Sequence, residues 1–150
     1  GELVTTSSDN AYHVKAYGYL TVPSTTNTFN VSIAAGTQRY LAIICGDASA
    51  SANRFGCNVD TTTWQIVSTG TNSSGVLTSA TIKTNAKNSN WHDVQITGTT
   101  PNTSIAVYIC SRDSSAWDGN TLTNTAGNGT WYNWGFDVRT SNDGVGIPIN

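Results

Sequence analysis

The segment TFNVSI, residues 28–33, alternates polar and apolar side chains without a break. Its apolar residues fall on one side of an extended chain and its polar residues on the other. Strict alternation is typical of a β-strand with one buried face. Residues 91–97 (WHDVQIT) and 130–139 (TWYNWGFDVR) repeat the pattern. The sequence therefore predicts one-sided strands along much of the chain.

Two further segments are apolar on both faces, namely RYLAIIC at residues 39–45 and SIAVYIC at residues 104–110. Such runs predict central strands that are covered on both sides. The cover would be a long loop or another subunit, and the second alternative allows a homo-oligomer. If these two strands run in the same direction, the loops that follow them leave the same end of the molecule.

These patterns predict an all-β fold, an antiparallel, jelly-roll-like β-sandwich of about nine or ten strands. No helical periodicity is apparent, and residues 46–60 and 111–129 read as long polar loops. Further strands are predicted at residues 12–22, 64–68, 76–83 and 145–149. We expect a single domain over residues 1–150, excised from or processed out of a longer protein because the chain contains no Met.

Composition argues against several classes of partner. Charged residues make up 11% of the chain, the net charge is −2, and the seven Lys and Arg residues are scattered. Binding to a nucleic-acid backbone needs clustered cations, so we expect no nucleic-acid partner. No apolar run is long enough to span a bilayer, so we expect no membrane insertion.

The inventory of acid, base and nucleophile residues is poor for an enzyme. The only Glu is Glu2, and the two histidines are His13 and His92. His92 falls on the apolar face of its strand, which predicts a hydrogen-bonded structural histidine. We find no Gly-x-Ser-x-Gly, HExxH or P-loop motif. The sequence therefore predicts a non-enzyme, and a small hydrolase that uses a pair of Asp residues is the alternative.

Aromatic residues on polar strand faces are the most informative feature. Trp91 shares its face with Asp93, and Trp131 shares its face with Asn133. A flat ring flanked by amides and carboxylates suits a sugar, because the ring covers the C–H face and the polar groups take the hydroxyls. These residues are predicted to bind a ligand. The alternative is that each Trp is covered by a loop and extends the core.

The loop at residues 111–129 is the second candidate, because loops of this length are usually functional or mobile. Trp117, Asp118 and Asn120 are predicted to bind the ligand. Asp113, Asp118 and Asn120 also offer oxygen atoms to Ca²⁺. A simple Asp-Gly-Asn turn is the alternative. The predicted function requires no cofactor, and Ca²⁺ is the one metal ion that the sequence suggests.

The three cysteines, Cys45, Cys57 and Cys110, allow at most one internal disulfide. A bridge from Cys45 to Cys57, a bridge from Cys45 to Cys110, and three buried thiols are alternatives that the sequence leaves open.

In manner the chain resembles carbohydrate-binding modules of secreted bacterial enzymes, bacterial lectins and the tips of bacteriophage tail fibres. The likeness rests on strands rich in Thr, Ser and Asn, few charges and the lack of Met, and it transfers no residue roles. We predict a non-catalytic, lectin-like module that binds a glycan or polysaccharide. It would be secreted, or displayed on a cell or virion, and act in adhesion. The alternative is a receptor-binding or structural domain of a larger assembly, such as a tail-fibre tip or capsid spike.

Overall fold

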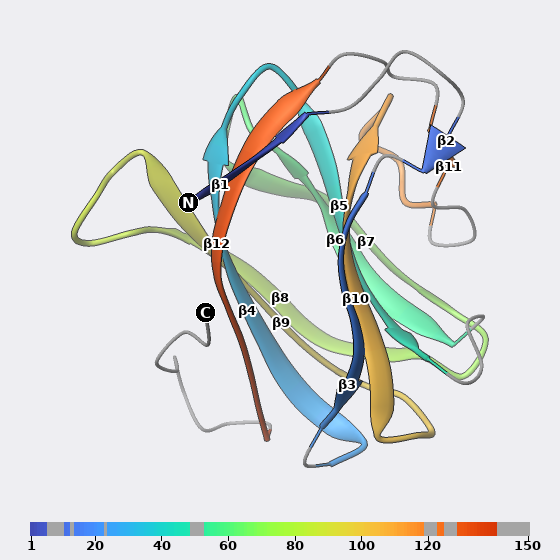
Figure 1. Cartoon of the computed structure of the whole chain (residues 1–150). Helices are drawn as coiled ribbons and strands as arrows, with labels where there is room; N and C mark the ends of the chain where they lie inside the picture. The colour runs from blue at the N-terminus through green and yellow to red at the C-terminus, as the bar shows by residue number, and fades with distance from the viewer. Residues whose placement is uncertain are drawn as a thin grey trace.

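The computed structural model describes residues 1–5, 11–12, 14–22, 24–48, 53–118, 123–124 and 129–140. These residues form β-strands joined by turns and loops (Figure 1). The strands are β1 (Glu2–Thr5), β2 (Ala11–Tyr12), β3 (Val14–Thr21), β4 (Thr26–Ala35), β5 (Tyr40–Asp47), β6 (Arg54–Asp60), β7 (Gln65–Asn72), β8 (Val76–Thr84), β9 (Trp91–Thr99), β10 (Ser104–Arg112), β11 (Thr123–Asn124) and β12 (Thr130–Thr140).

Within the described residues, ten strands make two five-stranded antiparallel sheets, and the remaining two make a small separate pair. Sheet 1 has the order β1-β12-β4-β9-β8, and sheet 2 has the order β3-β10-β5-β6-β7. Figure 1 shows them as two facing layers, with β12 and β4 in one and β10 and β5 in the other. The predicted all-β sandwich is confirmed.

The strand pairing is that of a jelly roll. β1 pairs with β12, β3 with β10, β4 with β9 and β5 with β6, so early strands pair with late ones as in a single rolled-up hairpin. β7 and β8 are added between the fifth and sixth strands of this scheme, β6 and β9. Each extends one sheet at its edge, and a tight turn at residues 72–75 joins them.

The core lies between the sheets and is built by the alternation seen in the sequence. Phe29, Val31 and Ile33 of β4 all point inward and are almost fully buried. The Phe29 ring contacts Phe55 of sheet 2, with 6.0 Å between ring centroids, and stacks with Phe136 of β12 at 6.5 Å. These aromatic contacts link the two layers.

Several boundaries differ from the prediction. The polar stretch at residues 46–60 contains β6, whose residues from Phe55 to Asp60 are all buried. β5 and β10 are antiparallel neighbours, so the condition for a shared loop end is not met, and the loops that follow them leave opposite ends of the sandwich. β1 was not predicted. The predicted strand at residues 145–149 lies outside the described residues.

The cysteines are free and buried. Cys45 and Cys57 belong to the core between the sheets, whereas Cys110 belongs to a separate cluster on the outer side of sheet 2. Cys45 and Cys110 therefore lie on opposite faces of one sheet, which rules out that pairing in this fold. The described part of the chain holds no helix of the length and hydropathy that crossing a membrane requires.

Candidate functional site

A pocket lies where β4 ends and β9 begins, at one end of the sandwich, with a volume of about 460 Å³. We call it the aromatic pocket, because four rings line it, those of Trp64, Trp91, His92 and Tyr132. Its other lining residues are small or polar, namely Ala34, Ala35, Ser89 and Asn90. Apolar rings beside a few polar groups are the usual make-up of a small-molecule site.

Two of the rings flank a small residue across sheet 1. Ala34 of β4 pairs with Tyr132 of β12 on one side and with Trp91 of β9 on the other. All three point away from the core, because Ile33 next to Ala34 is fully buried. Ala34 is itself 7% exposed, and the tip of the Trp91 indole lies against Gly1 at the N-terminus. The structure therefore places Trp91 on the outer face, as predicted, and beside a ring that was not predicted as a site residue.

Trp64 and His92 form another wall of the pocket. Their rings are stacked, with 3.7 Å between centroids and 14° between planes. Trp64 has a φ of 55°, a left-handed conformation that is uncommon for a bulky residue. A residue in such a conformation persists only where its surroundings hold it, at a cost of about 1–3 kcal/mol.

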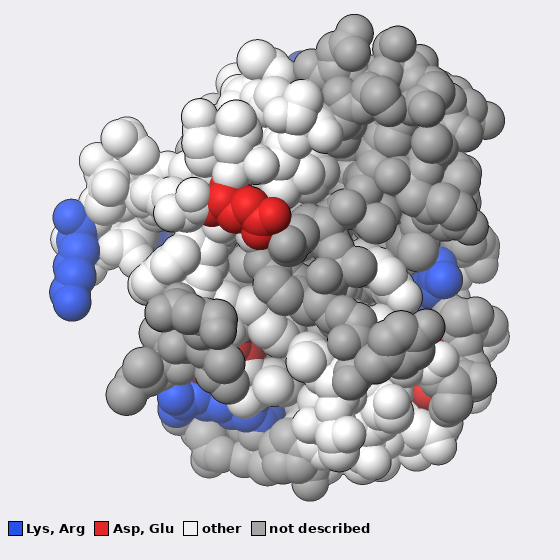
Figure 2. All heavy atoms as spheres, viewed as in Figure 1, with Lys and Arg blue, Asp and Glu red and all other residues white. Residues whose placement is uncertain are grey.

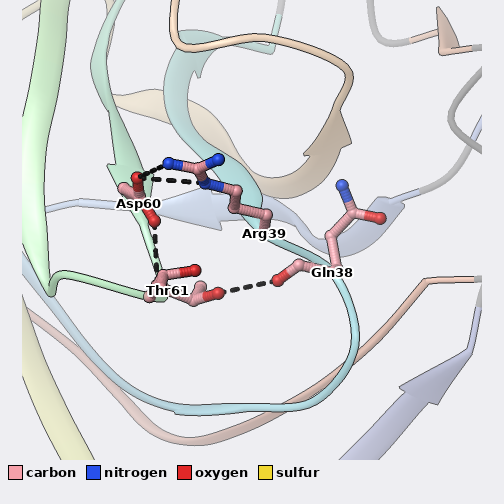
Figure 3. Close-up of polar contacts among 5 residues, drawn as sticks. Gln38, Arg39, Asp60 and Thr61 are labelled. Atoms are coloured by element: carbon pink, nitrogen blue, oxygen red, sulfur yellow. Dashed lines mark hydrogen bonds and ion pairs between the residues drawn. The ribbon is translucent and has the colours of Figure 1, made fainter.

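The surroundings that hold Trp64 are a polar network around Asp60 (Figure 3). The guanidinium of Arg39 donates two hydrogen bonds to Asp60 Oδ2, at 3.2 Å and 3.0 Å. Thr61 Oγ1 donates to the backbone oxygen of Gln38 at 2.8 Å, and the Trp64 N–H donates to the Asp60 carbonyl at 2.8 Å. These hydrogen bonds connect turn 61–64 to turn 36–39 and hold the Trp64 ring against His92.

Loop 85–90 supplies the polar side of the pocket and is ordered by its own asparagines. Asn85 Oδ1 accepts hydrogen bonds from the N–H groups of Lys87 and Asn88, and Asn88 Oδ1 accepts one from the Asn90 N–H. Asn85 Nδ2 donates to Asp93 Oδ2 at 3.1 Å. These local bonds are those of Asx turns. Ser89 and Asn90 therefore project from a pre-organised loop.

Asp93 lies two residues along β9 from Trp91 on the same face and pairs with Ser32 of β4. Its carboxylate accepts hydrogen bonds from the Ser32 hydroxyl and from the Asn85 amide. The described contacts of Asp93 therefore anchor loop 85–90 to the sheet. Its predicted role as a partner for ligand hydroxyls stays a prediction.

Trp131 and Asn133 are not on an exposed face, which corrects the prediction for both. Trp131 is 0% exposed and packs in the core, and Asn133 is 2% exposed. The cause is a β-bulge between Trp134 and Asp137, where Gly135 has a φ of 67°. A bulge shifts the alternation by one residue, so a face assigned from one half of β12 is wrong for the other half. The exposed aromatic residues of this strand are Tyr132 and Trp134, at 39% and 45%.

Trp117 lies far from the aromatic pocket, on the outer face of sheet 2. Its indole stretches along the paired glycines Gly56 and Gly70, so close that a Cβ atom on Gly70 would lie 2.2 Å from Cδ1. The indole N–H donates to Asn72 Oδ1 at 3.3 Å. With Tyr108, Trp117 covers a small apolar cluster of Ala42, Ile44 and Cys110. One face of this ring is thus used in packing.

The loop that carries Trp117 is held down by buried polar groups. Asn58 is 0% exposed, and its Nδ2 donates to the backbone oxygen of Ala116 at 2.6 Å. Ser68 Oγ donates to the backbone oxygen of Ser115. Residues 113–118 therefore cover sheet 2, as one of the two predicted alternatives requires. Another subunit is not needed to explain this apolar face.

The residues proposed for Ca²⁺ are only partly described. Asp113 and Asp118 are exposed, and Asn120 lies outside the described residues. The backbone oxygen of Asp118 accepts a hydrogen bond from Arg112 Nη2 at 2.9 Å. Among the residues that the structure describes, no group of three or more His, Cys, Asp or Glu side chains is arranged to hold a metal ion. The calcium site stays a prediction.

The aromatic pocket is uncharged. None of its lining residues is an Asp, Glu, Lys or Arg, and burial holds the pKa of His92 below its usual value, although Asp93 partly opposes this shift. Charged side chains are also sparse elsewhere, and Figure 2 shows them separated from one another on the face in view. An uncharged ligand would leave no buried charge without a partner in this pocket.

Of the predicted ligand-binding residues that the structure describes, only Trp91 lines the pocket, and Asp93 lies beside it. Prediction from the sequence missed Tyr132, Trp64 and loop 85–90. The run NAKNSN at residues 85–90 was the available signal, because closely spaced asparagines form turns that fix a loop. No protein-family model matches the chain, and no curated protein is significantly similar to it in sequence, so its function has to be inferred from this geometry.

Proposed function

We propose that this protein is a non-catalytic carbohydrate-binding domain that holds one sugar ring in the aromatic pocket. The observation that carries the proposal is the arrangement of Trp91 and Tyr132 on either side of Ala34. Two strand spacings separate β9 from β12, which is about 9–10 Å. Both side chains line the pocket, so a sugar ring bound there would lie against them.

The polar rim supports a sugar rather than a purely apolar ligand. Ser89 and Asn90 offer a hydroxyl and an amide next to the rings, where hydroxyl groups of a bound sugar would be exposed. Loop 85–90 is already ordered by its asparagine turns, so little ordering entropy is lost on binding. As a glycan-binding module the domain would act outside the cell or on an external surface.

A glycan array followed by titration calorimetry tests the proposal. We expect specific binding to a subset of glycans, and at least about a tenfold loss of affinity in Trp91→Ala and in Tyr132→Ala. Tyr132→Phe keeps the ring and separates stacking from hydrogen bonding. Val76→Ala is the control, because Val76 is an exposed apolar residue at the other end of the sandwich.

Two results would overturn the proposal. The first is an array that stays silent across its neutral and acidic glycans. The second is binding that Trp91→Ala and Tyr132→Ala leave unchanged. Repeating the positive spots in EDTA tests the calcium prediction separately, since loss of binding would place a cation in or near the site.

A further inference from the structure

The outer face of sheet 1 continues beyond the aromatic pocket. Trp134 lies two residues along β12 from Tyr132, and both point away from the core. Two residues of a strand span about 6.8 Å, so Trp134 lies one side-chain step along the outer face from Tyr132. Trp134 is 45% exposed, so its ring offers an open surface next to the pocket.

The residues across the sheet from Trp134 are polar. Trp134 pairs with Ser32 of β4, and Ser32 pairs with Asp93 of β9. Asp93 in turn pairs with Lys83 of β8. This row therefore places an aromatic ring, a hydroxyl, a carboxylate and an ammonium side by side, in the order in which the strands lie.

The carboxylate in this row is already engaged by neighbouring polar groups. Lys83 lies opposite Asp93 in the register, and Asp93 also accepts hydrogen bonds from Ser32 and Asn85. The aromatic pocket itself is uncharged. An acidic sugar would therefore place its charge in a pocket whose lining carries no cation, close to the Asp93 carboxylate, and burying it there would cost free energy.

We propose that the ligand is a neutral oligosaccharide whose terminal unit occupies the aromatic pocket and whose second unit stacks on Trp134. This inference rests on the proposed function and adds the length, direction and charge of the glycan. The sugar chain follows β12 from Tyr132 toward Trp134. It does not run across the sheet toward Leu3, which lies on the other side of Tyr132.

The test is a titration of the neutral mono-, di- and trisaccharides of the sugar that the array selects. We expect the disaccharide to bind at least about tenfold more tightly than the monosaccharide. Trp134→Ala should remove this gain and leave monosaccharide affinity unchanged, and Trp134→Phe should restore part of it. Trp91→Ala should weaken both ligands. The matching uronic acid should bind at least about tenfold more weakly than the neutral monosaccharide.

Leu3→Ala is the matched control, because Leu3 is 51% exposed and borders Tyr132 on the opposite side. It should leave all affinities unchanged. The inference is overturned if the disaccharide binds no more tightly than the monosaccharide, or if Leu3→Ala rather than Trp134→Ala removes the gain. An equal loss of both ligands in Trp134→Ala, or tighter binding of the uronic acid, overturns it as well. Each of these results leaves the pocket proposal standing, whereas failure of every sugar to bind overturns both.

Discussion

His92 is buried, yet it is ionisable and lies flat against Trp64. Burial is the main reason why the pKa of His92 lies below its usual value, and the nearby Asp93 opposes the shift in part. The folded protein therefore resists protonation of this ring. An unfolded chain has no such resistance, and its histidines titrate near pH 6.5.

This difference predicts how stability depends on pH. Above about pH 6.5 the contribution of His92 is fully present, because the ring is neutral in both states. As the pH falls from there toward the lowered folded pKa, the unfolded chain binds more protons and the free energy of unfolding decreases. Urea unfolding at pH 7.5 and pH 5 should show this loss in the native protein and a smaller one in His92→Gln. An equal loss in both proteins would contradict the prediction.

Asp60 titrates outside this window, which keeps the two effects apart. Burial alone would raise the pKa of Asp60, but the hydrogen bonds from Arg39 and from the Thr62 N–H outweigh burial, and the pKa is lowered. The contribution of Asp60 is therefore present above about pH 4, the ordinary pKa of an unfolded Asp, and is lost only at more acid pH.

At the scale of the element, β12 shows what sequence periodicity can predict about a strand and what it cannot. Alternation correctly identified a strand at residues 130–139. It misplaced Trp131 because the bulge at Gly135 shifts the phase. A glycine within a strand pattern is the only sequence signal of such a bulge, and it does not say whether one is present. The pairing partner decides it.

β6 shows a second limit of prediction from local sequence pattern. Its residues RFGCNVD combine a glycine and polar residues in a strand that is buried on both faces. Gly56 and Asn58 face the loop that carries Trp117, and Asn58 bonds to that loop. Their burial depends on a segment about 60 residues later in the chain, so local pattern could not reveal it. The pocket could not be predicted for the same reason, because its rings come from three separate segments of the chain.

Gly70 gives an element-scale prediction. A methyl group there would collide with the Trp117 indole, with 2.2 Å between the new Cβ and Cδ1. Gly70→Ala should therefore lower the free energy of unfolding by about 1–3 kcal/mol, as overpacking does. Urea unfolding measures the change, and tryptophan fluorescence should report the displaced ring.

The matched control is Gly46→Ala, where the nearest atom is the flexible Cγ of Arg54 at 3.3 Å. Its stability should stay close to that of the native protein or rise slightly, because alanine restricts the unfolded chain. Sugar binding should be unchanged in both variants. Equal stability of Gly70→Ala and the native protein would show that Trp117 does not pack on this strand as described.

At the scale of the whole molecule, the reactivity of the three thiols shows how readily the folded protein opens. Cys45 and Cys57 lie between the sheets and Cys110 lies beneath the Trp117 loop. Burial raises the pKa of Cys57 and of Cys110 to about 12, and that of Cys45 well above its usual value. Reaction needs the thiolate, so all three should be inert in the folded protein.

We predict how many of the three thiols react under each condition. At pH 8 an aromatic disulfide reagent should modify none of the three thiols rapidly in native buffer, and all three in concentrated denaturant. The native protein should also show the same mobility on reducing and non-reducing gels. Rapid modification of even one thiol without denaturant would show that part of the sandwich opens far more readily than its packing implies.

The turn between β7 and β8 has a practical use that follows from where these two strands were added to the jelly roll. It lies at the end of the sandwich opposite the aromatic pocket, and Ser74 in it is exposed. With every native thiol shielded, a cysteine in place of Ser74 would be the one site open to conjugation. A dye, a bead or a surface attached there would leave the end with the aromatic pocket pointing outward, so a domain that binds sugar as proposed would serve as an oriented glycan probe.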